Sequence, residues 1–304
     1  MILLGILAAS GAGGIQPGVA GYSAGGSTGA YVSTVDKFAF PSDSRTTLGT
    51  GLSSGRNRIA GMSNSGVAGY AAGGTTGSNV ATVDKFAFPG DSRTTLGTGL
   101  SSGRQGPAGM SNSGVAGYAA GGNTGAYVST TDKFAFPSDS RTTLGTGLSS
   151  NRSNPAGMSN SGVAGYAAGG EPLTATVDKF AFPSDSRTTL GTGISGSRRL
   201  LTGMSNAGVA GYAAGGLEGS YVATVDKFAF PSDSRTTLGT GLSSARLGPA
   251  GMSNAGVAGY AAGGFTGSNV ATVDKFAFPG DSRTTLGTGL SVSRSSLAGF
   301  QDGV

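Results

Sequence analysis

Residues 66–104, "GVAGYAAGGTTGSNVATVDKFAFPGDSRTTLGTGLSSGR", return along the chain almost letter for letter. Within this stretch the Gly-Tyr-x-Ala-Gly-Gly element starts at Gly69 and the Asp-Lys-Phe-Ala-Phe element starts at Asp84. Each element occurs six times in 304 residues, at intervals of 48 residues apart from one interval of 46. A fixed period of this length predicts a repeat architecture. Six near-identical copies without atypical terminal copies indicate a closed ring, because the ends of an open stack need polar caps.

Each repeat divides into four short extended runs separated by turn residues. In one copy we expect run a at 59–63, run b at 67–72, run c at 81–88 and run d at 93–100. The intervening residues 64–66 and 89–91 have the Asn, Ser, Gly, Pro and Asp composition of tight turns. Four antiparallel strands repeated six times predict an all-β fold, a six-bladed β-propeller of four-stranded blades. The Gly- and Ala-rich runs a and b suit its crowded centre, and the Phe and Leu residues of runs c and d suit its rim.

The two ends of the chain predict how the ring closes. The C-terminal "RSSLAGFQDGV" aligns with "RNRIAGMSNSGV", so the chain stops just after completing a run a. The propeller therefore spans residues 18–304, and its first blade takes run a from 297–300 and its other three strands from Gly18 onward. This closure by the C-terminal strand removes the free strand edges that invite aggregation.

Residues 1–17 precede the first repeat and open with the apolar run "MILLGILAAS". The run lacks the preceding positive charge of a secretory signal, and it is shorter than the roughly 20 residues of a membrane span. We interpret residues 1–17 as an apolar tail that docks on another protein, with a self-packed strand as the alternative.

The absent residue types exclude several classes of chemistry. Without Cys or His the chain has no disulfide, no thiolate nucleophile and none of the commonest metal ligands, so we expect no metal site and no cofactor. A carboxylate pair could act as acid and base without His. However, Asp recurs in identical settings, and the two Glu residues, Glu171 and Glu218, stand alone in variable segments. We therefore predict that the protein is not an enzyme. The net charge of +5 is spread without a Lys/Arg run, which indicates no nucleic-acid partner.

The repeat resembles the kelch motif. Five successive elements of the repeat are similar to it: Gly-Tyr-x-Ala-Gly-Gly, the aromatic run c, the Asp turn, the leucine run d and Leu-Ser-Ser-x-Arg. The kelch motif likewise has a di-glycine after its second strand and an Arg leading into the next blade. The resemblance covers residues 18–304 and implies a propeller. The Trp of the kelch outer strand is absent, and Leu96 and its equivalents take its place.

Nearly all differences between the six copies fall in two segments, the b–c connection after the di-glycine and the d–a connection after Leu-Ser-Ser-x-Arg; otherwise the a–b turn varies between Ser and Ala and the c–d turn between Ser and Gly. In an up-and-down blade these two connections lie at the same end, so the variation is expected on one face of the disc. Loops carried by a rigid scaffold are where binding commonly resides, although drift of exposed loops is the alternative. The candidate binding residues on this face are Tyr31, Arg58, Asn79, Tyr127, Glu171, Arg199, Glu218, Tyr221, Phe265 and Asn269.

Six arginines precede run a and are expected to ring the same face: Arg56, Arg104, Arg152, Arg198, Arg246 and Arg294. They would form a cationic ring for an anionic ligand. Alternatively they are structural and bond to loop carbonyls or to a neighbouring blade. The Pro-x-Asp-Ser-Arg turns are expected to be structural too, with Asp43 and Arg45 satisfying turn amides and one another.

The opening "LLGILAAS" and the Gly-rich repeats resemble some virion proteins of tailed phages, marine ones in particular. That resemblance implies a virion location, with residues 1–17 docked on other virion proteins and the variable face turned toward a host-surface glycan or protein. A secreted or cell-surface lectin-like bacterial adhesin is the alternative, and a polysaccharide hydrolase or lyase is a third. No membrane span is expected in any of these.

Overall fold

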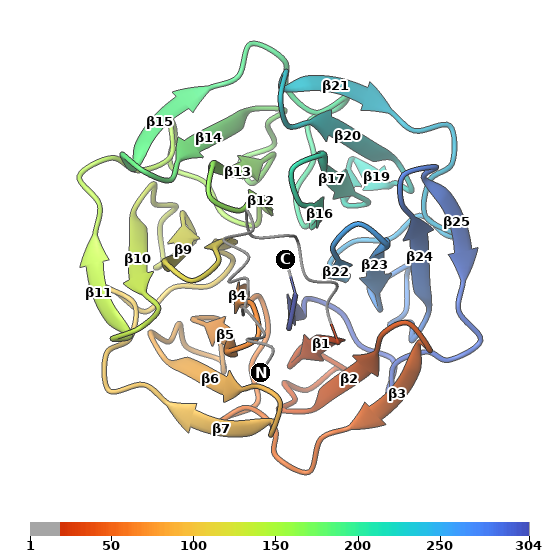
Figure 1. The fold of residues 1–304 in the computed structure, drawn as a ribbon, viewed down its shortest axis with the longest axis horizontal. Coiled ribbons are helices and arrows are strands. Elements are labelled where there is room, and N and C mark those ends of the chain that lie inside the picture. The colour runs from red at the N-terminus through yellow and green to blue at the C-terminus, as the bar shows by residue number, and fades with distance from the viewer. Residues whose placement is uncertain (1–18, 304) are drawn as a thin grey trace, which may run out of the picture.

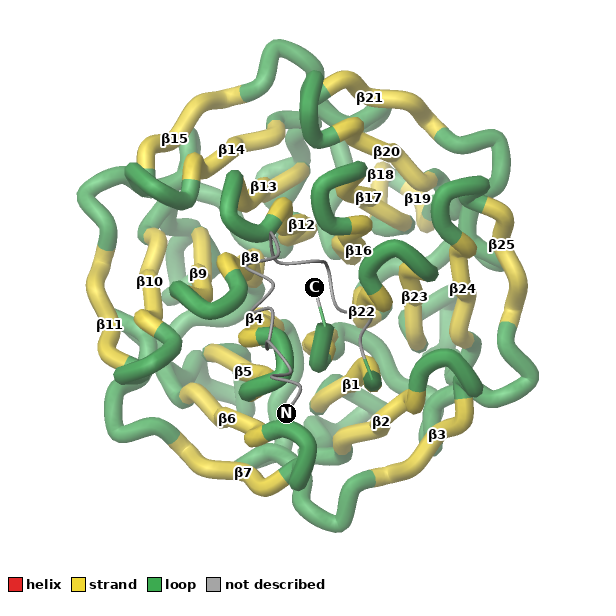
Figure 2. The backbone as a smooth tube through the Cα atoms, viewed as in Figure 1, coloured by secondary structure: helices red, strands yellow, loops and turns green. Residues whose placement is uncertain are grey.

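The computed structural model describes residues 19–303, which form six four-stranded antiparallel sheets arranged as blades around a central axis (Figure 1). The predicted six-bladed β-propeller is thereby confirmed. Figure 2 shows that the described chain consists of strands joined by loops and turns, without helices. The apolar tail predicted for residues 1–17 lies outside the described residues.

We number the blades 1 to 6 and letter their strands a to d from the axis outward. The a strands are β26 (Ala298–Gln301), β4 (Ala60–Asn64), β8 (Ala108–Asn112), β12 (Ala156–Asn160), β16 (Thr202–Asn206) and β22 (Ala250–Asn254). The b strands are β1 (Ala20–Ala24), β5 (Ala68–Ala72), β9 (Ala116–Ala120), β13 (Ala164–Ala168), β17 (Ala210–Ala214) and β23 (Ala258–Ala262).

The c strands are β2 (Val35–Ala39), β6 (Val83–Ala87), β10 (Thr131–Ala135), β14 (Val177–Ala181), β20 (Val225–Ala229) and β24 (Val273–Ala277). The d strands are β3 (Ser44–Thr47), β7 (Ser92–Thr95), β11 (Ser140–Thr143), β15 (Ser186–Thr189), β21 (Ser234–Thr237) and β25 (Ser282–Thr285). Two further short strands, β18 (Leu217–Glu218) and β19 (Ser220–Tyr221), form a hairpin in the b–c loop of blade 5.

The ring closes as the chain ends predicted. The C-terminal strand β26 pairs with β1, placing Phe300 opposite Tyr22 and Ala298 opposite Ala24. In blade 2 the equivalent register places Met62 opposite Tyr70. Phe300 therefore fills the position that Met62 and its counterparts fill in the other blades.

The d strand is shorter than predicted. In blade 2 run d was expected to extend to residue 100, but β7 ends at Thr95. Beyond it the chain leaves the strand path and passes close to the start of the c strand, where Leu100 N–H donates to the Ala81 carbonyl at 2.8 Å. A Cβ on Gly99 would lie 2.4 Å from that same oxygen, so only glycine fits there. The bend buries Leu100, which a straight strand would leave on the rim.

The hydrophobic core lies between blades. One buried cluster joins Met62, Tyr70 and Leu100 of blade 2 to Phe134 and Phe136 of blade 3, and corresponding clusters fill the other five junctions. At the axis the a strands approach so closely that a Cβ on Gly61 would lie 1.9 Å from the Gly299 carbonyl oxygen. The Gly- and Ala-rich runs thus occupy the centre, as predicted.

Adjacent blades are also joined by a repeated side-chain clasp. Asp91, in the c–d turn of blade 2, accepts hydrogen bonds from Tyr22 Oη and Lys37 Nζ of blade 1, both at 2.7 Å. The Tyr22 ring stacks on Phe88 of blade 2, and Lys37 Nζ lies 5.4 Å from the centroid of the same tyrosine ring. The same clasp closes the ring, because Tyr260 and Lys275 of blade 6 both donate to Asp43 of blade 1.

This clasp corrects one expectation from the sequence. Asp43 and Arg45 do not pair with one another: Asp43 binds the preceding blade, and Arg45 lies 3.6 Å from Asp36 within its own blade. Asp43 lies in the turn before β3, with φ of 58°, whereas Arg45 lies within β3, so the two side chains point to different partners although only one residue separates them.

Candidate functional site

The structure brings the two variable loops of each blade together on one face of the disc. In blade 2 the backbones of Asn57, in the d–a loop, and Thr75, in the b–c loop, form a β-bridge. The five equivalent bridges pair Ser27 with Ser295, Gln105 with Asn123, Ser153 with Glu171, Arg199 with Leu217 and Leu247 with Phe265. We call the surface formed by these twelve loops the variable face, and the surface formed by the a–b and c–d turns the constant face.

The candidate residues occupy equivalent positions on the variable face. Tyr31, Asn79, Tyr127, Tyr221 and Asn269 each pair across their own b–c hairpin, opposite the residue that bridges to the d–a loop. Tyr31 is exposed, and the other four are half-buried. On a backbone that is nearly constant, this position carries tyrosine in blades 1, 3 and 5 and asparagine in blades 2 and 6.

Three of the four charged candidates, Glu171, Arg199 and Glu218, lie on blades 4 and 5, and the fourth, Arg58, lies on blade 2. The Arg199 guanidinium pairs with the Glu171 carboxylate across the boundary between blades 4 and 5. Desolvation and the neighbouring Glu171 carboxylate raise the pKa of the Tyr127 hydroxyl above its ordinary value, while Arg199 and Arg58 oppose this effect. Tyr127, Glu171 and Arg199 therefore form one linked polar cluster. Glu218 is exposed and stands outside it, without an ion pair within the described part of the chain.

Apolar candidates gather on blades 5 and 6. The rings of Tyr221 and Phe265 meet edge to face with centroids 5.9 Å apart, and Leu217 and Leu247 occupy the bridging positions beside them. By contrast, the loops of blades 2 and 3 are joined by polar contacts, since Asn79 Nδ2 donates to the Asn123 carbonyl at 2.9 Å. The variable face thus has an aromatic side and a polar side.

The six arginines expected to ring this face are buried. The side chain of each is 0–1% exposed, and each is paired with the Asp that opens the Asp-Lys-Phe element: Arg56–Asp84, Arg104–Asp132, Arg152–Asp178, Arg198–Asp226, Arg246–Asp274 and Arg294–Asp36. Five of these pairs have N···O distances of 2.9–3.0 Å. Guanidinium groups in this environment cannot reach a ligand on the surface. The geometry favours the structural alternative.

Each of these aspartates collects several donors. Asp84 Oδ2 accepts from the backbone N–H and hydroxyl of Ser53 at 2.8 and 2.9 Å, and Asp84 Oδ1 accepts from Thr95 at 2.7 Å. Burial by itself raises the pKa of the Asp84 carboxyl, but these donors and Arg56 outweigh it and hold the pKa below its usual value. The group is therefore a fixed anion that ties the d–a loop to strands c and d.

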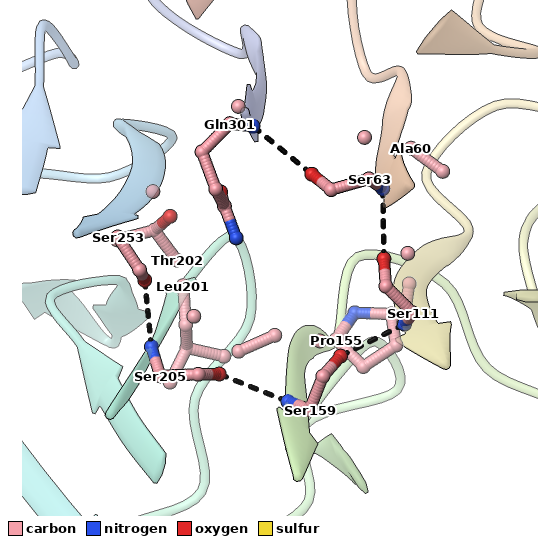
Figure 3. A pocket seen from close by; sticks show the side chains of 18 of the residues that line it. Ala60, Ser63, Ser111, Pro155, Ser159, Leu201, Thr202, Ser205, Ser253 and Gln301 are labelled. Atoms are coloured by element: carbon pink, nitrogen blue, oxygen red, sulfur yellow. Dashed lines mark hydrogen bonds between the residues drawn. The ribbon is translucent and has the colours of Figure 1, made fainter. Parts of the chain in front are cut away.

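A narrow channel follows the propeller axis between the a strands, with a cavity of about 120 Å³ (Figure 3). A chain of hydrogen bonds runs around it, in which the backbone N–H of Ser63 donates to Ser111 Oγ at 2.8 Å and the pattern repeats through Ser159, Ser205 and Ser253. The backbone N–H of Gln301 donates to Ser63 Oγ at 2.9 Å. Its side chain has no hydroxyl that could accept a bond from the backbone N–H of Ser253 in the same way. The ring of serine hydroxyls is therefore broken at residue 301.

On the variable face the channel opens through a ring of six d–a residues. Their backbone N–H groups each donate to the next carbonyl around the ring, at 2.6–3.0 Å, and all six have φ between 52° and 66°. We call these residues the mouth ring: Arg58, Gly106, Asn154, Leu200, Gly248 and Ser296. They line a pocket of about 70 Å³ together with the residues that follow them.

The sequence predicted one member of the mouth ring, Arg58, as a binding residue and missed Asn154, Leu200 and Ser296. The Gly and Asn residues at the same register in three copies were an available signal, because both tolerate positive φ. Among the described residues, no group of three or more Asp or Glu side chains is arranged to hold a metal ion. Residues 19–303 also contain no helix long and apolar enough to cross a membrane.

The fold and the variable face define the class of this protein, a six-bladed β-propeller whose blades are nearly identical except in the loops of one face. Comparison with protein-family models and with curated proteins finds no match.

Proposed function

We propose that this propeller is a non-enzymatic binding protein whose variable face attaches to a host-surface glycan or protein. One observation carries the proposal: the copies differ on a single face, where Tyr31, Tyr127, Tyr221 and Phe265 supply aromatic contact area. Aromatic side chains are enriched in recognition surfaces.

The carboxylates support a role without catalysis. Six aspartates are buried against the six arginines, and six more accept the Tyr and Lys side chains of the preceding blade. These twelve of the fifteen carboxylates have structural partners, and Glu171 is paired with Arg199. Polysaccharide turnover by the wild-type protein that disappears in Glu218→Gln would overturn the non-enzymatic proposal.

A glycan array and a host-cell adhesion assay test the binding face directly. The test variant combines Tyr31→Ser, Tyr127→Ser and Tyr221→Ser. The matched control combines Ser42→Gly, Ser138→Gly and Ser184→Gly on the constant face, where Gly90 and Gly280 already occupy the equivalent positions. The test variant should lose binding while the control retains it, and binding that survives in the test variant would contradict the proposal.

We further propose that the protein belongs to a phage virion, with residues 1–17 attaching it to other virion proteins. The apolar opening sequence and the Gly-Tyr-x-Ala-Gly-Gly repeats support this proposal. Mass spectrometry of purified particles should detect peptides of this chain, and deletion of residues 1–17 should reduce their incorporation. Particles that lack the protein would contradict a virion role and would favour a cell-surface adhesin.

The di-glycine and Leu-Ser-Ser-x-Arg elements also support a kelch-like ancestry of the repeat. Homologous sequences with tryptophan at the position of Leu96 would support this ancestry, and a family in which none carries it would contradict it.

A further inference from the structure

Nineteen of the twenty cationic side chains have a carboxylate partner within residues 19–303, the part of the chain that the structure describes. The six lysines pair with aspartates of the c–d turns at 2.6–2.7 Å. Twelve arginines, six buried and six on the rim, pair with the aspartates of the Asp-Lys-Phe elements. Arg199 pairs with Glu171. The remaining cation is Arg58.

Within residues 19–303 the Arg58 side chain donates one hydrogen bond, to Gln105 Oε1 at 3.3 Å. A guanidinium carries five N–H donors in a planar fork. Most of its donor capacity is therefore unused by the described residues. Because Glu171 is already neutralised by Arg199, the neighbouring polar cluster leaves the charge of Arg58 unbalanced.

The position of Arg58 concentrates this charge at the propeller axis. It belongs to the mouth ring and lines the pocket of about 70 Å³ at the channel opening. The other described side chains that line this pocket are neutral, among them Asn154, Leu200 and Ser296. One water molecule takes up about 10–15 Å³ of such a cavity, so the pocket has room for a carboxylate or phosphate group with a few waters.

We propose that the mouth of the channel binds an oxyanion, a carboxylate or a phosphate, carried by the ligand of the variable face, and that Arg58 forms the ion pair with it. The proposal rests on the proposed function of this face as a binding surface. A guanidinium pairs with either oxyanion through two parallel N–H···O bonds. The rest of the ligand would extend outward over the b–c loops. The cationic role expected of six arginines is thereby assigned to one.

The backbone of Arg58 supplies a variant that keeps the fold. Arg58 has φ of 52°, and the equivalent residue in blade 4 is Asn154 with φ of 56°. Arg58→Asn therefore places at this position a residue that the chain already uses in the same conformation. Its mouth-ring bonds are unaffected, since they involve only backbone atoms. The melting temperature of Arg58→Asn should equal or exceed that of the wild type.

Isothermal titration calorimetry on the full chain tests the proposal with defined probes. The probes are a galacturonate oligosaccharide, the same oligosaccharide with its carboxylates methyl-esterified, and inorganic phosphate. Arg58→Asn should weaken galacturonate binding at least tenfold, the effect of losing one charge-assisted pair. Esterification should weaken wild-type binding to the same degree, and Arg58→Lys should retain part of the affinity. Relative affinities for galacturonate and phosphate distinguish the two sources of the oxyanion.

Arg141→Gln is the matched control, because it removes one positive charge from strand β11 of blade 3, which lies at the rim of the disc (Figure 1). It should bind both anionic probes as the wild type does. Equal binding by wild type and Arg58→Asn, an effect of Arg141→Gln as large as that of Arg58→Asn, or absence of binding to both anionic probes would each overturn the proposal.

The outcome also separates this inference from the proposed function. In one outcome the triple tyrosine variant loses host attachment, whereas Arg58→Asn keeps both host attachment and anion binding. This outcome supports the binding face and contradicts the oxyanion site. In the opposite outcome Arg58→Asn loses anion binding, whereas the triple tyrosine variant attaches to the host normally. This outcome supports the oxyanion site and contradicts a binding role of the wider aromatic surface.

Discussion

On the two faces of the disc, the links between neighbouring blades that recur around the whole ring are made by different groups. On the constant face the links are made by side chains: Tyr70 and Lys85 of blade 2 donate to Asp139 of blade 3, and the Gly114 N–H donates to Asn64 Oδ1. On the variable face the mouth ring is made by backbone N–H and carbonyl groups. A side-chain link constrains the residue type, whereas a backbone link constrains only φ and ψ. This difference explains why both faces consist of loops and yet only one varies.

The mouth ring illustrates the point residue by residue. Arg, Gly, Asn, Leu, Gly and Ser occupy its six positions with φ values that agree within 14°. In contrast, the clasp positions carry Tyr, Lys and Asp in all six copies. The variable face is therefore a surface on which side chains can change without loosening the ring.

Alkaline pH should produce the largest effect, because it attacks the constant clasp in all six places. Burial first, and then the hydrogen bond to Asp, raise the pKa of Tyr22 and its five equivalents well above the ordinary value near 10. A raised folded-state pKa means that stability is complete below pH 10 and is lost as the pH rises above it. Above pH 10, six such groups together lower the free energy of unfolding by about 8 kcal/mol for each further pH unit.

Phenolate absorbance and far-UV circular dichroism, recorded together above pH 10, check this prediction. The phenolate signal of the buried tyrosines should appear in one step with the loss of strand signal. Smooth titration of all nine tyrosines near pH 10 in a protein that remains folded would show that the clasp does not hold them neutral.

Removal of one buried arginine should have the next largest effect. Arg104→Ala removes the buried cation of Asp132 and leaves only the rim guanidinium of Arg141 at 3.6 Å, and breaking such a buried pair costs about 3–5 kcal/mol of unfolding free energy. Chemical denaturation measures this cost. Adding Asp132→Asn should recover part of it, because the remaining side chain is then neutral. A loss below about 1 kcal/mol for Arg104→Ala would indicate that the arginine is not required by the fold.

Loss of one clasp charge should have a smaller effect. Asp139→Asn keeps a residue that tolerates the observed φ of 53° but removes the ion pair with Lys85 and weakens the bond from Tyr70. The Lys85 and Asp139 side chains are 23% and 21% exposed, so solvent screens the pair and the expected loss is about 1–2 kcal/mol. Thermal denaturation of this variant should be compared with Ser138→Gly in the same turn, which should be close to neutral.

Exchange of a variable loop should have the smallest effect. Replacing residues 75–79 of blade 2, "TTGSN", by "NTGAY" from blade 3 keeps the same bridge across the hairpin. The unfolding free energy should change by no more than about 0.5 kcal/mol, as for most surface substitutions. Binding to the ligand of the variable face should change, since a tyrosine is added. A destabilisation as large as that of Asp139→Asn would remove the distinction between the two faces.

Much of the architecture was predictable from the repeat. Six copies at a period of 48 predicted six blades, and the offset between the chain ends predicted that 297–300 would complete the first blade. The length of strand d was predicted wrongly, because Thr, Leu and Gly beyond Thr95 alternate like a strand while Gly99 lets the chain approach the c strand and bend. An alternating pattern of residue types indicates the faces to which side chains point, but it does not indicate where two backbone segments approach each other closely.

The candidate site divides in the same way. The repeat alignment located the variable loops, since position-by-position comparison needs no coordinates. It could not distinguish Arg56, which is buried against Asp84, from Arg58, two residues later, which lacks a carboxylate partner in the described residues. Both are arginines of one loop, and only their surroundings in space differ.

The sequence by itself determined the number of blades, the seam of the ring and the segments that vary, because each of these is a property of period and alignment. Only the tertiary structure decided which charges are neutralised and which remain. Ion pairs such as Lys37–Asp91 and Arg294–Asp36 join residues 54 and 258 positions apart. The ring geometry brings such distant residues together. The one cation without a carboxylate partner among the described residues can therefore be identified only after all the other cations have been paired.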